Sequence, residues 1–159
     1  MSFHIRDFDP ARDKEAALSF IRGSQAYERQ VEPDRRTDPQ VADEYFPVLM
    51  QNVADKRGRI FVAEHDSKAI GWAAIIVEEN MLFVVKEQRT YGYITELYVD
   101  EKSRSLGAGR ALIAACEDEA RRLGLGHVMI GVLTRSERTA EVYARAGYQP
   151  YTSELRKYL

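Results

Sequence analysis

The sequence has little of several features that place a chain in a special class. Its 159 residues include one cysteine, Cys116, which excludes an internal disulfide framework and fits a reducing compartment. No apolar run is long enough to span a bilayer, and the first residues do not form a signal peptide. Lys and Arg number 23 against 25 Asp and Glu, without a basic block, which disfavours a nucleic-acid partner. We therefore expect a cytoplasmic protein that binds neither nucleic acid nor membrane.

The apolar pattern predicts a single domain over residues 1–159, a length that can bury a stable core. The first half of the chain predicts a strand at 3–8, a helix from 10 to 23, an irregular segment at 24–39 and a helix from about 38 that ends at Gly58. Strands follow at 59–64, at 69–77 or as far as 85, and at 93–99. The remainder predicts a helix at 106–123, a strand at 126–133, a helix that ends near 146, and one or two terminal strands over 148–151 and 152–158. The three middle strands should form an antiparallel meander. The crossover through the helix at 106–123 should make the strands on either side of it parallel.

One stretch in the middle of the chain carries the strongest functional signal. Residues 93–99 are β-branched and aromatic with a single charge, Glu96, which predicts a strand buried on both faces. Gly107 and Gly109 then lie at the first turn of the next predicted helix. Unpaired backbone N–H groups and the helix dipole favour a phosphate there, and Arg104 could add a charge-assisted bond. The stretch therefore predicts a site for a phosphorylated ligand.

Two common phosphate-binding loops do not fit this stretch. Leu112 stands where a Rossmann fingerprint needs a small residue, and Arg110 stands where a P-loop needs lysine. The remaining pattern, Arg104-x-x-Gly107-x-Gly109 after a strand with a carboxylate, resembles the acetyl-CoA-binding motif Arg/Gln-x-x-Gly-x-Gly/Ala. That motif belongs to the GNAT N-acetyltransferase superfamily.

A second motif near the end of the chain supports this resemblance. GNAT proteins often carry Asn-x-x-Ala-x-x-Leu-Tyr-x-Lys-x-Gly-Phe after the fifth strand. In this sequence the matching segment keeps the residue type at Val142, Tyr143, Arg145, Gly147 and Tyr148, and has Ser136 and Thr139 in place of the Asn and the Ala. With two motifs in the right order, the chain is identified as a member of the superfamily.

The resemblance implies a fold and an activity. The GNAT fold is a mixed α/β architecture with a central, mostly antiparallel sheet, in which strands four and five are parallel and splayed, flanked by about four helices. The implied activity is transfer of an acetyl group from acetyl-CoA to a primary amine of a small molecule or protein, by direct attack within a ternary complex and without a metal. A non-catalytic acyl-CoA-binding module, a structural interaction domain and a homodimer through the terminal strands stay open.

Two residues are the predicted catalytic groups. Glu96 is the only carboxylate in the buried strand, so desolvation should raise its pKa toward a value that suits a general base for the attacking amine. Alternatively, Glu96 faces the edge of the sheet or pairs with a nearby arginine and has no catalytic role. Tyr143 matches the family's tyrosine general acid, which would protonate the leaving thiolate. It also lies on an apolar helical stripe, where a tyrosine would pack in any case.

The resemblance also assigns ligand contacts. The implied cofactor-binding residues are Leu97, Tyr98 and Val99 along the strand, Arg104, Ser105, Leu106, Gly107, Ala108, Gly109 and Arg110 around the loop, and Ser136. The candidates for the acceptor pocket are Tyr27, Glu28, Glu32, Glu78, Glu79 and Tyr91. Their carboxylates would suit a cationic amine, although each one taken singly fits a solvated surface residue equally well.

Overall fold

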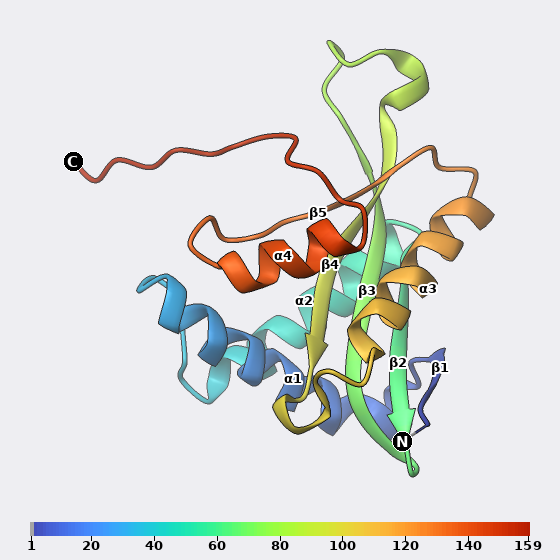
Figure 1. The fold of residues 1–159 in the computed structure, drawn as a ribbon, viewed down its shortest axis with the longest axis vertical. Coiled ribbons are helices and arrows are strands. Elements are labelled where there is room, and N and C mark those ends of the chain that lie inside the picture. The colour runs from blue at the N-terminus through green and yellow to red at the C-terminus, as the bar shows by residue number, and fades with distance from the viewer. Residues whose placement is uncertain (1) are drawn as a thin grey trace.

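A computed structural model of the chain describes residues 2–159. It contains a five-stranded sheet in the order β1-β2-β3-β4-β5, with α1 and α2 on one face and α3 on the other (Figure 1). The strands are β1 (His4–Asp7), β2 (Arg59–His65), β3 (Lys68–Glu79), β4 (Thr90–Val99) and β5 (Val128–Ile130), and the helices are α1 (Pro10–Val31), α2 (Gln40–Asp55), α3 (Ala108–Arg122) and α4 (Glu137–Arg145). No helix within this part of the chain is long and apolar enough to cross a membrane.

The strand pairing confirms the predicted mixed sheet. Strands β1 to β4 pair antiparallel in sequence order, whereas β4 and β5 run parallel. The parallel pairing joins only residues 92–94 to residues 128–130, although β4 continues to Val99. The two strands therefore part halfway along β4, as the predicted splay requires.

The core lies on both faces of β2 and β3. Trp72 is fully buried on the side of α1, where its ring lies 6.2 Å from the rings of Phe8 and Phe20. Cys116 is equally buried on the side of α3. Burial raises the pKa of the Cys116 thiol to about 12, which keeps it protonated at neutral pH and fits a packing role.

Helix α1 is longer than the sequence predicts, and its expected end at Gly23 was wrong. The helix continues to Val31, so the first part of the segment at 24–39 is helical and not irregular. A Cβ atom at Gly23 would collide with the hydroxyl group of Tyr98. The glycine therefore allows β4 to pack closely against α1, a role that the sequence pattern does not distinguish from a helix stop.

The predicted terminal strands were also wrong. Residues 149–159 have no regular secondary structure and are all exposed, and they run away from the sheet in Figure 1. A strand needs a neighbour for its backbone groups, and β5 offers an edge of only three residues. The tail is held instead by Arg156, which pairs with Glu32 at 2.9 Å and with Asp34.

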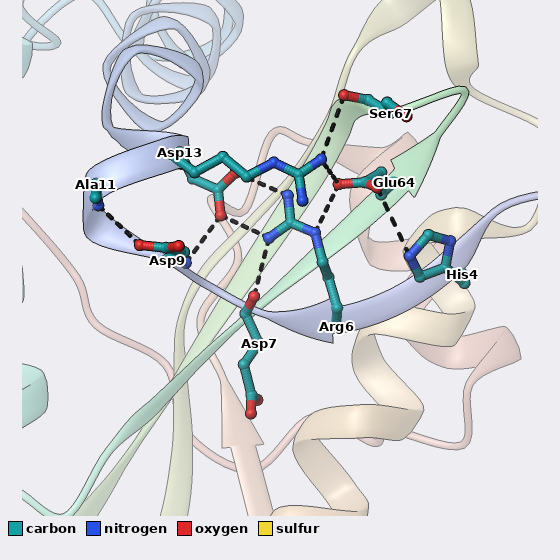
Figure 2. A network of polar contacts seen from close by, with 9 residues as sticks. His4, Arg6, Asp7, Asp9, Ala11, Asp13, Glu64 and Ser67 are labelled. Carbon is teal, nitrogen blue, oxygen red and sulfur yellow. Dashed lines mark hydrogen bonds and ion pairs between the residues drawn. The ribbon is translucent and has the colours of Figure 1, made fainter.

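A network of ion pairs fastens β1 to α1 and β2 (Figure 2). Arg6 donates two hydrogen bonds to Asp13, at 2.6 and 2.8 Å, and one to Glu64 at 2.6 Å. These bonds lower the pKa of both carboxyl groups. Asp13 and Glu64 are buried, and buried charges are stable only when they are paired. The network therefore has a structural role at the edge of the sheet.

Candidate active site

A cavity of about 450 Å³ opens between α1, α2 and the middle of β4. It lies where β4 and β5 begin to separate, and α4 contributes to its wall. The ionisable side chains that line it are Glu28, Arg36, Glu44, Tyr45, Glu96 and Tyr143. The fold thus brings the two predicted catalytic residues, Glu96 and Tyr143, to a single cavity.

A β-bulge in β4 decides which face of the sheet Glu96 occupies. Ile94 pairs with Ile75 and Glu96 pairs with Ala74, so Thr95 is an extra residue without a partner on β3. In a regular strand Ile94 and Glu96 would point to the same face. Ile94 packs in the core beneath α3, and the extra residue turns Glu96 to the opposite face, toward α2.

The surroundings of Glu96 suit a general base. Its Oε1 atom accepts a hydrogen bond of 2.6 Å from the Tyr45 hydroxyl, so its partner is a tyrosine and not an arginine. Burial raises the pKa of Glu96 to about 7, the hydrogen bond from Tyr45 lowers it, and the negative charge of Glu28 raises it. A carboxylate with this pKa is charged in part of the population at neutral pH and accepts a proton readily.

Tyr143 lies in the wall of the same cavity, in surroundings that are compatible with both roles expected for it. Burial raises the pKa of its hydroxyl to about 12, so the group stays protonated at neutral pH and can donate a proton. The ring also packs, with its centroid 6.3 Å from that of Tyr148. Packing and proton donation are compatible because they use different parts of the side chain.

The loop before α3 has the shape of an anion site. Gly107 is the N-cap residue of the 15-residue helix, with a left-handed φ of 88° and no side-chain cap. A Cβ atom at this position would meet no other atom within 4 Å. The space beside the first N–H groups of α3 is therefore open, and these groups with the positive end of the helix dipole fit a pyrophosphate.

Arg104 of this loop is directed toward α1. Its guanidinium carbon lies 5.7 Å from the centre of the Tyr98 ring and 5.9 Å from that of Tyr27. Its Nε donates a hydrogen bond of 3.1 Å to the carbonyl of Val99. The side chain is thus held near two aromatic rings at the end of β4, and its contact with a phosphate stays a prediction.

Tyr27, predicted for the acceptor pocket, contacts Ser136, predicted for the cofactor. The Tyr27 hydroxyl lies 2.9 Å from the Ser136 Oγ and 3.2 Å from the Thr139 Oγ1. Ser136 is 5% exposed and precedes α4, so this contact ties α1 to the start of α4. A residue predicted for the acceptor pocket, Tyr27, is therefore in hydrogen-bond contact with a residue predicted to bind the cofactor, Ser136.

The structure places the remaining acceptor candidates apart. Glu28 lines the cavity, whereas Glu32 pairs with the tail. Glu78 pairs with Lys56, Tyr91 stacks on His127, and Glu79 ends β3; all three lie along the hairpin of β3 and β4, outside the cavity. Sequence reasoning missed the cavity residues Arg36, Glu44 and Tyr45. Glu44 and Tyr45 follow the pattern of any amphipathic helix, and Arg36 stands in a charged connection between two helices.

Comparison with known proteins agrees with this geometry. The family model described as "Acetyltransferase (GNAT) family" matches residues 17–148. The chain belongs to the GNAT acetyltransferase family. Members of this family use acetyl-CoA, and the loop before α3 of this GNAT protein offers open space for its phosphates.

Three relatives show how far the similarity reaches. The GNAT chain is 25% identical over 115 residues to glucosamine 6-phosphate N-acetyltransferase from Trypanosoma brucei brucei. The aligned residues make up 69% of this chain and 74% of that protein. The crystal structure of a GCN5-related N-acetyltransferase from Ralstonia eutropha is 25% identical, covers 99% of both chains and has a TM-score of 0.76. A mutant of the BH1408 protein from Bacillus halodurans shares the fold, with a TM-score of 0.84 over 98% of this chain and 99% of that one at 19% identity.

Proposed function

We propose that this GNAT protein is an N-acetyltransferase that moves an acetyl group from acetyl-CoA to a primary amine of a small molecule or protein. The proposal rests on one observation. Glu96 and Tyr143 line the same cavity, and the strand that carries Glu96 leads directly into the loop that fits phosphates. This proximity supports direct reaction of both substrates within one ternary complex.

The cofactor would lie along the free part of β4. Beyond Ile94, no strand of residues 2–159 pairs with the edge of β4 that faces β5. Backbone groups of residues 97–99 can therefore pair with an extended pantetheine arm. The pyrophosphate would rest on the N–H groups of residues 106–109, with Arg104, Ser105 and Arg110 beside it, and Ser136 would face the arm from α4.

The chemistry assigns one proton step to each catalytic residue. Acetyl-CoA would supply the acetyl group as a thioester. Glu96 accepts a proton from the ammonium form of the acceptor, directly or through water, and the neutral nitrogen then bonds to the carbonyl carbon. Backbone N–H groups near residues 97–99 stabilise the charge on the carbonyl oxygen. Tyr143 donates its proton to the sulfur as the carbon–sulfur bond breaks, which releases free CoA, and the second proton that the nitrogen loses restores the Tyr143 hydroxyl.

The charges of the cavity favour a cationic acceptor. Glu28, Glu44 and Glu96 line it together with a single cation, Arg36. Glu28 is paired with Arg35 and Glu44 with Arg36, so Glu96 is the carboxylate of the cavity that is bonded to no arginine of the described chain. Arg36 is already bonded to Glu44 at 2.7 Å and to Asp38 at 2.8 Å. An acceptor with a phosphate, such as the one named for the Trypanosoma relative, would have to displace these carboxylates. We therefore expect amines without an anionic group to be the better acceptors.

Acetyl-CoA should raise the melting temperature of the protein. At about a hundredfold excess over its dissociation constant, a ligand stabilises the folded state by about 2.7 kcal/mol. For a domain of this size the expected rise is roughly 5–10 °C. A thermal-shift titration measures it, with ATP and NAD as controls, and no shift with acetyl-CoA would contradict the proposal. An amine screen for CoA release then separates an enzyme from a module that only binds acyl-CoA.

Tyr143→Phe should lower turnover while leaving the fold intact. The substitution keeps the ring that packs against Tyr148 and removes only the proton donor, whose contribution is on the order of 10²-fold. The kcat should fall by about that factor at saturating substrates, with an unchanged melting temperature. Wild-type kcat in this variant would mean that Tyr143 only packs.

A further inference from the structure

We propose that Tyr45 is the positioning residue of Glu96, and that its hydroxyl holds one oxygen of the carboxylate so that the other is left for the acceptor amine. This inference rests on the proposed function, because it concerns the group assigned as the base. Tyr45 lies outside both GNAT motifs of the sequence. It comes from α2, and neither motif includes a residue of this helix.

The geometry of the pair supports a positioning role. The Tyr45 hydroxyl lies 2.6 Å from the Glu96 Oε1, a length expected for a hydrogen bond to a charged oxygen. The ring packs against the core cluster between α1, α2 and the sheet, which restricts where the hydroxyl can go. Glu96 in turn follows the bulge at Thr95. Both partners are therefore placed by the backbone of rigid elements.

Within residues 2–159, Tyr45 is the only side chain that forms a hydrogen bond with Glu96. The other ionisable groups of the cavity come from each element around it: Glu28 from α1, Arg36 from the α1–α2 connection, Glu44 from α2 and Tyr143 from α4. Arg36 is held by Asp38 and Glu44, and Glu28 by Arg35 at 2.8 Å. Among the described residues, Tyr45 is thus the group that holds the carboxylate by a direct side-chain hydrogen bond.

The bond widens the pH range in which the base is charged, against the larger effect of burial. A hydroxyl that donates to a carboxylate stabilises the charged form and so lowers its pKa. Burial acts in the opposite direction on Glu96, whose pKa is about 7. Without the Tyr45 hydroxyl, burial would act unopposed and a larger fraction of Glu96 would be protonated at neutral pH.

A direct titration of Glu96 tests this role without knowledge of the acceptor. The full-length protein is labelled with ¹³C at the glutamate carboxyl carbons, and the Glu96 signal is assigned from its loss in Glu96→Gln. The wild-type midpoint should lie near 7, and the midpoint in Tyr45→Phe should lie about one pH unit higher. An unchanged or lower midpoint in Tyr45→Phe overturns the proposal. If Tyr45→Phe folds poorly, Tyr45→Leu serves the same titration.

Tyr148→Phe is the matched control. It removes a bond of the same kind, from the Tyr148 hydroxyl to Glu117 at 3.2 Å, outside the cavity. The Glu96 midpoint should not move in this variant, and an equal shift in both variants would overturn the specific role of Tyr45. The proposed function has a separate test, because the titration midpoint of Glu96 does not depend on turnover. The proposed function fails if Glu96→Gln keeps wild-type turnover with an amine from the screen.

Discussion

Glu96→Gln will remove most of the turnover of this protein and leave its affinity for acetyl-CoA unchanged. Glutamine has the size of glutamate, and its amide oxygen can still accept the bond from Tyr45, but it cannot accept a proton from the amine. A general base contributes about 10²- to 10⁴-fold to a rate. We expect kcat/KM to fall by that factor at neutral pH.

The rates of the wild type and of Glu96→Gln should depend on pH in different ways. Glu96 must be charged to act, so the wild-type kcat/KM should fall as the pH drops below the pKa of about 7. In Glu96→Gln the dependence on a group with a pKa of about 7 should be lost, and the rate should instead follow the fraction of neutral amine, which falls steadily below the amine pKa of about 10.4. The ratio of the wild-type rate to the variant rate should therefore be largest at about pH 7 and below, where the amine needs the base to lose its proton. The ratio should shrink toward about pH 10, where the amine becomes neutral without the base.

Steady-state kinetics between about pH 5.5 and 10 measure this difference, with an acceptor amine from the screen. Glu15→Gln is the control, since Glu15 is an exposed residue of α1; it should behave as the wild type. Calorimetry should give the same dissociation constant for acetyl-CoA in all three proteins. Wild-type kinetics in Glu96→Gln at every pH would remove Glu96 as the base.

Gly107→Val should abolish binding of acetyl-CoA. The valine side chain meets no protein atom at this position, but it would fill the space that we assign to the pyrophosphate. It would also sit at a φ of 88°, which is strained for any residue with a Cβ by about 1–2 kcal/mol. We expect the dissociation constant to rise at least about a hundredfold, as for the loss of two hydrogen bonds to a charged group.

Gly124→Val separates the loss of ligand space from the backbone strain, because it introduces only the strain. Gly124 follows the other end of α3, also has a left-handed φ, of 73°, and also has open space around the position of a Cβ. Its variant should lose a similar amount of stability and keep its affinity for acetyl-CoA. Calorimetry and thermal melting of both variants make the comparison. Full affinity in Gly107→Val would show that the phosphates lie elsewhere.

The local pattern of the chain was sufficient to predict much of this architecture. Continuous runs of apolar and β-branched residues marked the strands of the meander, and the crossover rule made β4 and β5 parallel. The glycines of the loop marked the start of α3, because glycine adopts the left-handed φ found at Gly107 without steric cost. These features depend on neighbours within a few residues along the chain, and that is why a single sequence reveals them.

The sequence by itself therefore determined the family, the order of the elements and the candidates Glu96 and Tyr143. Only the tertiary structure decided which face Glu96 occupies, because the bulge at Thr95 depends on the register against β3. It also decided that Gly23 lies inside a helix, where Tyr98 packs against it. The partner of Glu96 on α2 comes from far away in the chain. Contacts between distant segments have no local signal, because they form only when the sheet and its helices pack together.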